Sequence, residues 1–491
     1  MARIVVLGAG VCGLASAMML ARDGHDVVVL ERDGARAPDT PQQAWTDWER
    51  AGITQFRLAH LLLPAGRAVL ESELPETIAA LTAAGAFRFD LLTGMPATIT
   101  DRRPRPGDGR FVTLTARRPV LEQALAGVAE HQPGLKVRRG VTVTGVMSQP
   151  RGTTPHITGV RLESGEEIAA ELVVDAMGRR SRLPQWLSAV GARQIEEECE
   201  DSGFSYYQRT FRSADGSVPR LIAPVGSPIG TIFLVTLPAD NGTWAVVIAT
   251  SSRDQQLKRL RDAEAWSAVV RACPLQAHWL DGEPITAVEA MGGLIDRRRR
   301  LAPDGYPVAT GIAAVADAWA CTNPSLGRGI SYGLRHARRL RDAVRDHLHD
   351  PAAFALAWDH VTEHGMRPFY EDVMAENRFR RAQMDALRDG SEPPRPNPQT
   401  ARFLAAALHD ADIFRAYLET RAALATTREV LGCQALSERV DRLGAPALKP
   451  LPGPDRAQLL ELVADAPNGR RSRTGARPAH RRGAVMSPRR G

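Results

Sequence analysis

The sequence predicts an α/β protein with a β-rich insertion and a helical C-terminal region. Three observations predict this fold class: a glycine-rich strand–turn–helix–strand pattern at the N-terminus, a series of β-type runs in the middle of the chain, and a second strand–loop–helix pattern further on. A chain of 491 residues is too long for one small core, so we expect several domains. We place them at residues 1–195 and 291–345 (one nucleotide-binding domain in two parts), 196–290 (β-rich), 346–465 (helical) and 466–491 (a basic tail).

Three glycines follow the first apolar run, residues 4–7, and each has its own mechanical reason. Gly8 permits a tight turn, Gly10 lets the backbone approach a pyrophosphate, and Gly13 lets a helix pack closely on the strand. Apolar residues then recur at helical spacing. The N-terminus of this helix offers free N–H groups to phosphates.

The second apolar run, residues 27–30, ends in Glu31 and Arg32. A carboxylate at this point can accept hydrogen bonds from ribose hydroxyls. Strand, glycine turn, helix, strand and acid is the order that a Rossmann-like dinucleotide-binding unit requires. The pattern predicts a bound dinucleotide but does not say which one.

The following segment predicts helices and then strands. Apolar positions between 70 and 81 form one helical face that Gly85 closes, so we expect one helix there. Pro119 suits the first position of the next helix, and Arg118 stands at its entrance. The Arg118 guanidinium could reach a pyrophosphate or point into solvent. Strands are predicted at 137–146 and 157–162, with the polar residues 148–155 as their connection.

From residue 196 the pattern changes to antiparallel β. Asn241-Gly242 separates the β-rich runs 232–237 and 244–249 and predicts a tight hairpin. Tyr206 and Tyr207 lie on opposite faces of an earlier run, so at most one of them can face a substrate cavity; for each we expect packing in the core or on the surface. A β-rich insertion between two nucleotide-binding parts is a natural substrate domain.

Two further motifs point to the cofactor. Each begins with an acid that ends an apolar strand, and glycines follow. The residues are Asp175 and Gly178 in the first, and Asp317, Pro324, Gly327 and Gly329 in the second. A nicotinamide enzyme needs only the N-terminal motif, whereas a flavin also needs hydroxyl-binding groups and a helix N-terminus that stabilises the reduced ring. These motifs favour FAD; taken alone, the second motif could also be an ordinary strand–loop–helix.

Charge and composition exclude several classes of protein. The net charge is +7, but residues 466–491 hold eight arginines and no acid, which leaves about −1 for residues 1–465. We therefore predict no nucleic-acid partner, and a disordered tail that is either solvated or bound to an anionic partner. No apolar run approaches the ~20 residues that span a bilayer. With no convincing signal cleavage site, we expect a cytoplasmic protein without membrane contact.

The five cysteines are scattered without metal-ligand or paired spacing. They predict neither a disulfide framework nor a metal site.

On these residues the chain resembles the single-component flavoprotein monooxygenases with the p-hydroxybenzoate hydroxylase fold, over roughly residues 1–345. The resemblance rests on the N-terminal glycines with Glu31, and on residues 118–121, 175–182 and 317–329. Residues 52–60 and 175–187 are similar to a bacterial branch that includes polyether epoxidases. The chain departs from the family pattern at Ala316, where glycine is usual, and from the branch at Thr54; Met177 replaces a small polar residue.

The resemblance implies bound FAD, NAD(P)H as a transient electron donor, and O₂ used to hydroxylate or epoxidise a small organic molecule, such as a secondary metabolite. We name no catalytic residue, because the cofactor carries the hard chemistry. Arg57 is a further cofactor-side candidate, and His60 is interpreted as a hydrogen-bonded loop histidine rather than a base.

Two other functions share these motifs. A flavin dehydrogenase or reductase would act without oxygen insertion, and a non-catalytic FAD- or ligand-binding protein would show no turnover. A flavin halogenase would be expected to carry a W-x-W-x-I-P stretch and an active-site lysine. Trp45 and Trp48 lack that context, and the first lysine is Lys136. The substrate and the oligomeric state stay open.

Overall fold

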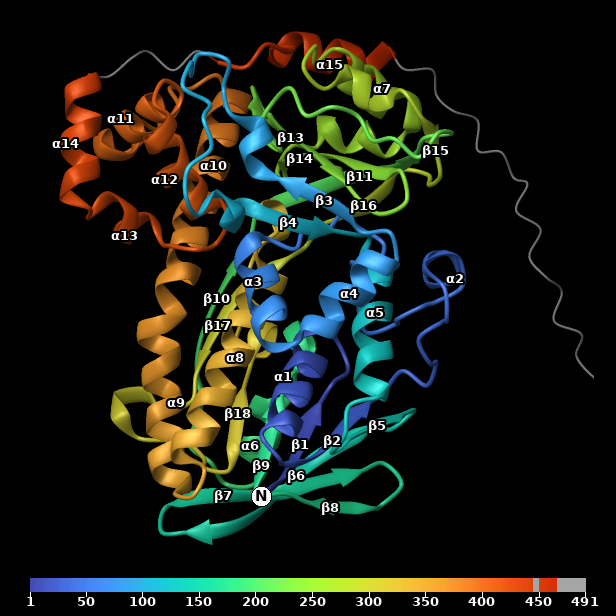
Figure 1. Ribbon diagram of the computed structural model, residues 1–491, viewed down its shortest axis with the longest axis vertical. Coiled ribbons are helices and arrows are strands. Elements are labelled where there is room, and N and C mark those ends of the chain that lie inside the picture. Colours follow the sequence, from blue (N-terminus) through green and yellow to red (C-terminus); the bar gives the residue numbers. More distant parts are fainter. Residues whose placement is uncertain (445–449, 466–491) are drawn as a thin grey trace, which may run out of the picture.

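The computed structural model describes residues 1–444 and 450–465, and the predicted tail at 466–491 lies outside these residues. Its central element is a five-stranded parallel sheet in the order β18-β9-β1-β2-β5 (Figure 1). The strands are β1 (Arg3–Leu7), β2 (Asp26–Glu31), β5 (Leu135–Arg139), β9 (Leu172–Asp175) and β18 (Ile312–Ala314). Ile4 lies opposite Val27 on one side and Leu172 on the other. The predicted Rossmann-like α/β fold is confirmed.

Both faces of this sheet are buried, which explains strands that are apolar throughout. Ile4 and Val6 pack on one face, and Val5 and Leu7 on the other. The first face is covered by α1 (Val11–Arg22), α5 (Arg118–Glu130), α8 (Gly329–His347) and α9 (Pro351–Gly365). The second is covered by α6 (Leu183–Ala189), the start of α10 (Arg367–Asp389), and the sheet of β6 (Val143–Arg151), β7 (Thr154–Leu162) and β8 (Glu167–Ala169).

Two sequence-based expectations are wrong in this part. Positions 70–81 form not one helix but two, α3 (Pro64–Glu73) and α4 (Pro75–Ala83). Pro75 causes the break, because it has no N–H to donate and its ring disfavours a helical backbone at the preceding Leu74, where φ is −139°. Residues 148–155 do not form a separate connection, because β6 and β7 continue as a hairpin around Gly152.

A second sheet is antiparallel, in the order β12-β13-β14-β11-β15, and β16 also pairs with β11. The expected hairpin is confirmed, since Asn241 and Gly242 both have positive φ, at 52° and 64°. The strands are β11 (Phe204–Arg212), β12 (Gly226–Ile229), β13 (Ile232–Pro238), β14 (Thr243–Ser251), β15 (Glu283–Pro284) and β16 (Glu289–Met291). One face packs against α7 (Ala263–Arg271) and α15 (Arg456–Asp465).

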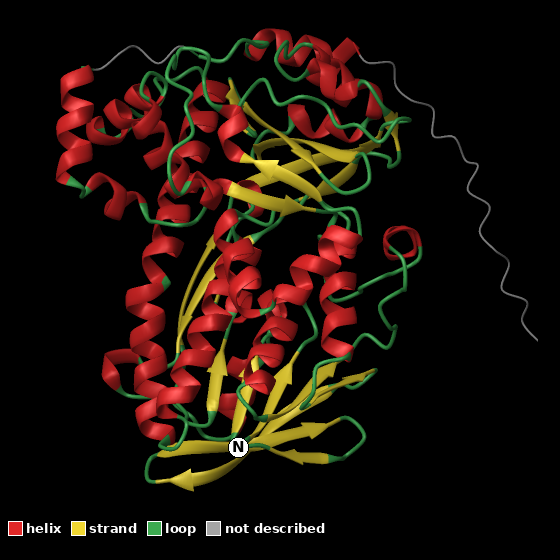
Figure 2. Cartoon of the chain, viewed as in Figure 1, coloured by secondary structure: helices red, strands yellow, loops and turns green. Residues whose placement is uncertain are grey.

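Two small sheets lie between these parts (Figure 2). One contains β10 (Glu196–Asp201), β17 (Ile295–Arg300) and β19 (Ala320–Cys321); the other contains β3 (Phe87–Asp90) and β4 (Val112–Thr115). The acidic strand β10 pairs with the basic strand β17. Glu198 and Arg298 are joined at 2.7 Å, as are Glu197 and Arg299, so the two strands neutralise each other.

The remaining helices form a cap beside the antiparallel sheet, joined to the lower part by the long α10 (Figure 1). They are α11 (Pro398–Ala407), α12 (Ala411–Arg421), α13 (Thr427–Leu431) and α14 (Gln434–Leu443); the short α2 (Pro41–Thr46) stands apart. Ion pairs between Arg415 and Asp108 at 2.7 Å and between Arg110 and Glu419 at 2.6 Å hold α12. None of the described helices combines the length and hydropathy that a membrane crossing requires.

A buried ion pair joins the parallel-sheet part to the antiparallel sheet. Asp240, in the hairpin, accepts hydrogen bonds from the Arg117 backbone N at 2.7 Å and from its Nη2 at 2.6 Å. The two side chains are only 0% and 5% exposed. The hairpin therefore holds the residue that directly precedes Arg118.

We expect Asp240→Ala to lower the free energy of unfolding by about 3–5 kcal/mol, because it leaves the Arg117 guanidinium buried and unpaired. Urea titration of the purified protein measures this change. Glu392→Ala removes an exposed pair with Arg395 and should change stability by less than about 1 kcal/mol. Equal effects of the two substitutions would contradict the role given to Asp240.

Candidate functional site

The predicted motifs meet at the carboxyl edge of the parallel sheet. Gly8 follows β1, Glu31 ends β2, Asp175 ends β9, and Asp317 follows β18. A methyl group placed on Gly178 would lie 3.8 Å from Asp317 Cβ, and one on Gly329 would lie 3.9 Å from Asp317 Oδ1. Segments more than 300 residues apart in the chain thus form one site, as parallel strands that end at the same edge allow.

The three N-terminal glycines are required for different reasons. A methyl group on Gly8 would lie 2.9 Å from the Ala176 carbonyl oxygen, and one on Gly13 would lie 2.1 Å from the Gly8 oxygen. The packing of the protein itself therefore excludes side chains at these two positions. Gly10 is different, because its φ of −80° suits any residue and, apart from its chain neighbours, no atom of the described residues lies within 4 Å of its missing Cβ.

The space beside Gly10 fits a pyrophosphate. Gly10 is the N-cap of α1, which has no side-chain cap and no acid in its first turn. Its N–H groups and positive dipole end therefore face an opening without a competing carboxylate. A glycine that the protein does not need, beside an uncapped helix N-terminus, is the arrangement that a dinucleotide requires.

Glu31 is buried in a network of charges that the sequence did not reveal. Its Oε2 accepts hydrogen bonds from Ala9 N at 2.8 Å and from Arg50 Nη2 at 2.7 Å. Arg50 Nη1 also donates to Glu122 at 2.9 Å. Arg50 and Glu122 are thus further residues of this site. In the sequence, Arg50 is a single charged residue in a loop and Glu122 is one in a helix, so neither marks a site. Arg32 is exposed beside Gly52 and does not join the network.

Arg118 is not a solvated surface residue. It opens α5, its side chain is 12% exposed, and its Nε donates to Glu122 at 2.7 Å. Its Nη1 lies 3.0 Å from His60 Nε2, and His60 Nδ1 lies 2.7 Å from the Leu58 oxygen. Burial, and then the Arg118 charge, lower the pKa of His60 to about 3. His60 is therefore neutral, donating through Nδ1 and accepting through Nε2.

The two acids of the later motifs have different environments. Asp175 is fully buried and accepts hydrogen bonds from Met177 N at 3.0 Å and from the Ser181 hydroxyl. Burial raises the pKa of Asp175 to about 6. Its bonds shape the turn that carries Gly178. Asp317 is partly exposed and has no hydrogen-bond or ion-pair partner among the described residues, so its oxygens remain available to a ligand hydroxyl.

Ala316 occupies a backbone conformation that glycine prefers, with φ of +55°. Its N–H donates to Nδ1 of the buried His336 at 3.2 Å, and His336 stacks on Trp358 with ring centroids 4.4 Å apart. Burial, followed by the Arg339 charge, lowers the pKa of His336 to about 3. A neutral histidine thus holds the residue that precedes Asp317.

The last motif borders a cavity of about 340 Å³. Pro324 and Gly327 line it on one side, and leucines from the antiparallel sheet and the helical cap line much of the rest. Its polar lining residues are Gln55, His60, Tyr206, Gln208, Ser325, Tyr417 and Arg421. The cavity is therefore largely apolar, with a few polar groups that could orient a ligand.

The expectation of mere packing is wrong for Tyr206, which lines this cavity and donates its hydroxyl hydrogen to Asn323 Oδ1. The folded chain brings strand β11 over the Asn323 loop, a contact with no trace in local sequence. Tyr207 packs in the core, as expected.

Arg57 donates to the Trp48 oxygen at 3.0 Å and lies over the Trp45 ring, so its guanidinium is held by its own loop.

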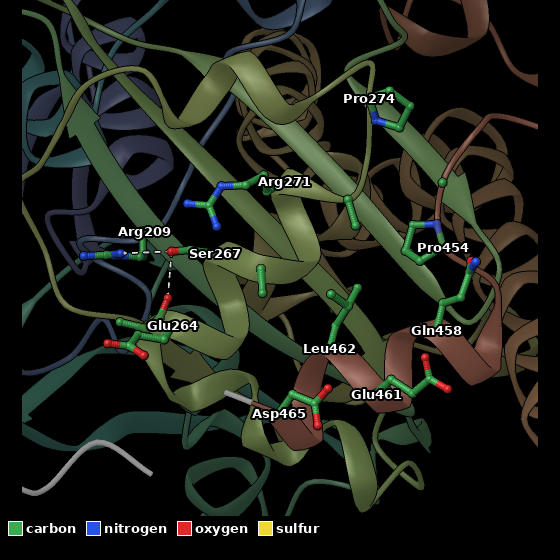
Figure 3. Close-up of a pocket in the computed structure, with 14 residues that line it drawn as sticks. Arg209, Glu264, Ser267, Arg271, Pro274, Pro454, Gln458, Glu461, Leu462 and Asp465 are labelled. Atoms are coloured by element: carbon green, nitrogen blue, oxygen red, sulfur yellow. Dashed lines mark hydrogen bonds between the residues drawn. The ribbon is translucent and has the colours of Figure 1, made fainter. Parts of the chain in front are cut away.

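A wider groove of about 970 Å³ lies between α7 and α15 (Figure 3). Arg209, Glu264, Arg271 and Glu461 are among its lining residues, and Arg209 Nη1 lies 3.5 Å from the Ser267 hydroxyl. None of the predicted cofactor residues lines it. The cofactor motifs therefore point to the smaller apolar cavity.

Fold and site together define the class of FAD-dependent oxidoreductases: a Rossmann-like sheet with an uncapped helix N-terminus at its edge, next to a largely apolar cavity. The family model for the FAD binding domain matches residues 1–279, and the chain belongs to this family.

Related proteins and structures agree with this assignment. Protein Rv3254 of Mycobacterium tuberculosis is 29% identical over 70% of this chain and 72% of its own. The menaquinone reductase of Mycolicibacterium smegmatis is 27% identical over 69% of this chain and 75% of its own. The crystal structure of PqsL, a probable FAD-dependent monooxygenase from Pseudomonas aeruginosa, has a TM-score of 0.58 at 19% identity, over 79% of this chain and 96% of its own. PqsL thus has the same fold.

We expect Gly10→Val to abolish FAD retention without unfolding the protein, because the new side chain enters the open space and meets no protein atom within 4 Å at its Cβ. Flavin absorbance per mole of purified protein measures retention. Gly127→Val is the matched control, because Gly127 in α5 also has an open surrounding and should keep its FAD. Full flavin content in Gly10→Val would refute the binding assignment.

The buried His336 predicts a pH dependence of stability. Its pKa in the folded protein lies below the ordinary value of about 6.5, so the unfolded chain binds the proton more tightly between pH 6.5 and 3. The contribution of the neutral His336 to the free energy of unfolding is complete above pH 6.5 and is lost as the pH falls. Between pH 6 and 5 the free energy of unfolding should therefore fall more steeply with falling pH in the wild type than in His336→Gln. The difference in slope should be about 1.4 kcal/mol per pH unit. Parallel slopes in urea titrations would contradict this assignment.

Proposed function

We propose that the protein is an FAD-dependent monooxygenase that uses NAD(P)H and O₂ to hydroxylate or epoxidise a small organic molecule. The observation that carries this proposal is the apolar cavity, which borders the loop of Pro324 and Gly327 and is covered by α11 and α12. Oxygen insertion needs a substrate held beside the flavin in a space that excludes water. A largely apolar cavity next to the FAD-binding part, lined by leucines, suits this need.

The proposed cofactor contacts follow the meeting of the motifs at the sheet edge. The α1 N-terminus would hold the pyrophosphate, Glu31 the adenosine side, and Asp317 with the α8 N-terminus the ribitol and ring side. The full set is Gly8, Gly10, Gly13, Glu31, Arg32, Arg118, Asp175, Gly178, Asp317, Pro324, Gly327 and Gly329. In this proposal residues 1–195 and 291–345 hold FAD, and residues 196–290 and 346–465 enclose the substrate.

The chemistry of electron transfer and oxygen activation would come from FAD. The protein's own groups position the substrate and shield it from water. The leucines keep water away from the apolar part of the substrate, and the neutral His60 adds no charge there. The N-terminus of α8 favours negative charge in front of the substrate. Tyr206, bonded to Asn323, can orient a polar group of the substrate.

A reductase that acts without oxygen insertion is the second candidate. The observation that favours it is the likeness to a menaquinone reductase over 69% of this chain. An apolar cavity suits a quinone as well as a monooxygenase substrate. The two functions differ in what oxidises the reduced flavin.

The proposal predicts that NADH or NADPH supports O₂ uptake that rises when apolar aromatic or aliphatic compounds are added, with an oxygen atom from ¹⁸O₂ found in the product. An oxygen electrode and mass spectrometry measure both. Leu404→Trp narrows the cavity and should reduce the stimulation, whereas Leu443→Trp changes an exposed site and should not. Reduction of menadione in the absence of O₂, together with no ¹⁸O in any product of the aerobic assays with ¹⁸O₂, would favour the reductase and refute the monooxygenase.

A further inference from the structure

One wall of the apolar cavity carries a cluster of charges. Arg421, at the end of α12, is the one lining residue with a permanent charge in the described chain. Its Nη1 donates to both oxygens of Glu376 on α10, at 2.8 and 3.1 Å. Arg328, in the loop before α8, donates to the same carboxylate at 3.2 Å. The cluster therefore links the helical cap, α10 and the FAD-binding part.

The cluster holds more positive than negative charge. Arg380, one helical turn from Glu376 on α10, lies over the ring of the cavity residue Phe233 at 4.6 Å and has no ion-pair partner among residues 1–444 and 450–465. Burial works against ionisation of Glu376, but Arg421, Arg328 and Arg380 together lower its pKa to about 2. Three guanidinium groups thus surround one carboxylate, which leaves a net charge of about +2 beside an apolar space.

Arg421 keeps donors available. Both of its hydrogen bonds to Glu376 start from Nη1, and neither Nε nor Nη2 bonds to a residue in the described part of the chain. The Nε–Nη2 edge of a guanidinium matches the two oxygens of a carboxylate. Exposure to an apolar cavity strengthens such a pair, because little water competes for the donors.

We propose that the cavity selects an apolar substrate that carries a carboxylate, and that Arg421 binds this group. The inference rests on the proposed function for the use of the cavity as the substrate site. Arg421 belongs to the C-terminal cap, so selection would lie outside the FAD-binding part. The cap would thus provide both the cover of the cavity and its anchor for the acid.

The experiment compares acids with their methyl esters on the FAD-loaded protein, without NAD(P)H, by isothermal titration calorimetry. The probes are decanoate, 2-naphthoate and the methyl ester of each. In the wild type we expect at least one acid to bind about 10- to 100-fold more tightly than its ester, the range that a hydrogen-bonded charge supplies. Arg421→Gln should bring the two affinities within a factor of about 3.

Two variants serve as controls. Arg421→Lys keeps the charge and should retain most of the preference for acids, although it loses the two-pronged geometry. Arg402→Gln removes an arginine of α11 that pairs at the surface with Asp441 and should leave the preference unchanged.

Three results would overturn the proposal: equal binding of acid and ester by the wild type, no binding of any acid, or an undiminished preference in Arg421→Gln. Loss of FAD from Arg421→Gln together with an unchanged preference would assign the cluster to the cofactor and also refute it. Because no turnover is measured, failure of oxygen uptake would count against the proposed function and not against this binding preference.

Discussion

The passage of the α1 N-terminus over the end of β1 is the contact on which the rest of the site depends. Gly13 comes so close to the Gly8 oxygen that it accepts no side chain, and the Ala176 oxygen excludes one at Gly8. These contacts bring the uncapped N-terminus of α1 to the sheet edge. The same edge receives Glu31, Asp175 and Asp317, because parallel strands end there together. The open space at Gly10 is what remains between these groups. The proposed dinucleotide site would thus be a consequence of sheet topology together with two close backbone contacts.

Substrate enclosure has a different origin. The His60 and Pro324 loops and the segment after β3 (Leu91, Gly94 and Pro96) line part of the cavity, and the β-rich part and the helical cap supply the rest. These parts are joined by buried or partly buried charges, such as Arg117 with Asp240 and Arg421 with Glu376. The family match covers residues 1–279, which include most strands of the antiparallel sheet, whereas α11 and α12 of the cap lie outside it.

Local patterns in the sequence predicted the elements that depend on neighbours in the chain. The glycine turn after β1 and the Asn241-Gly242 hairpin are such elements, because each needs a backbone geometry that few residues adopt. The resemblance to a family added the cofactor. Contacts between distant segments leave no pattern in the sequence, because no periodicity relates the residues that they join. Examples are Arg50 with Glu31 and Glu122, Tyr206 with Asn323, and the cluster at Arg421. Pro75 indicates a helix break in the sequence itself, but the apolar periodicity that continues across it led to the wrong prediction of one helix.

The measurement that tests this account most directly is a crystal structure of the FAD-loaded protein. We predict that the pyrophosphate lies beside Gly10 within hydrogen-bond distance of the first N–H groups of α1, with the flavin ring against the loop of Pro324 and Gly327 and facing the apolar cavity. FAD bound anywhere else, such as in the groove between α7 and α15, or a flavin ring turned away from the cavity, would contradict it.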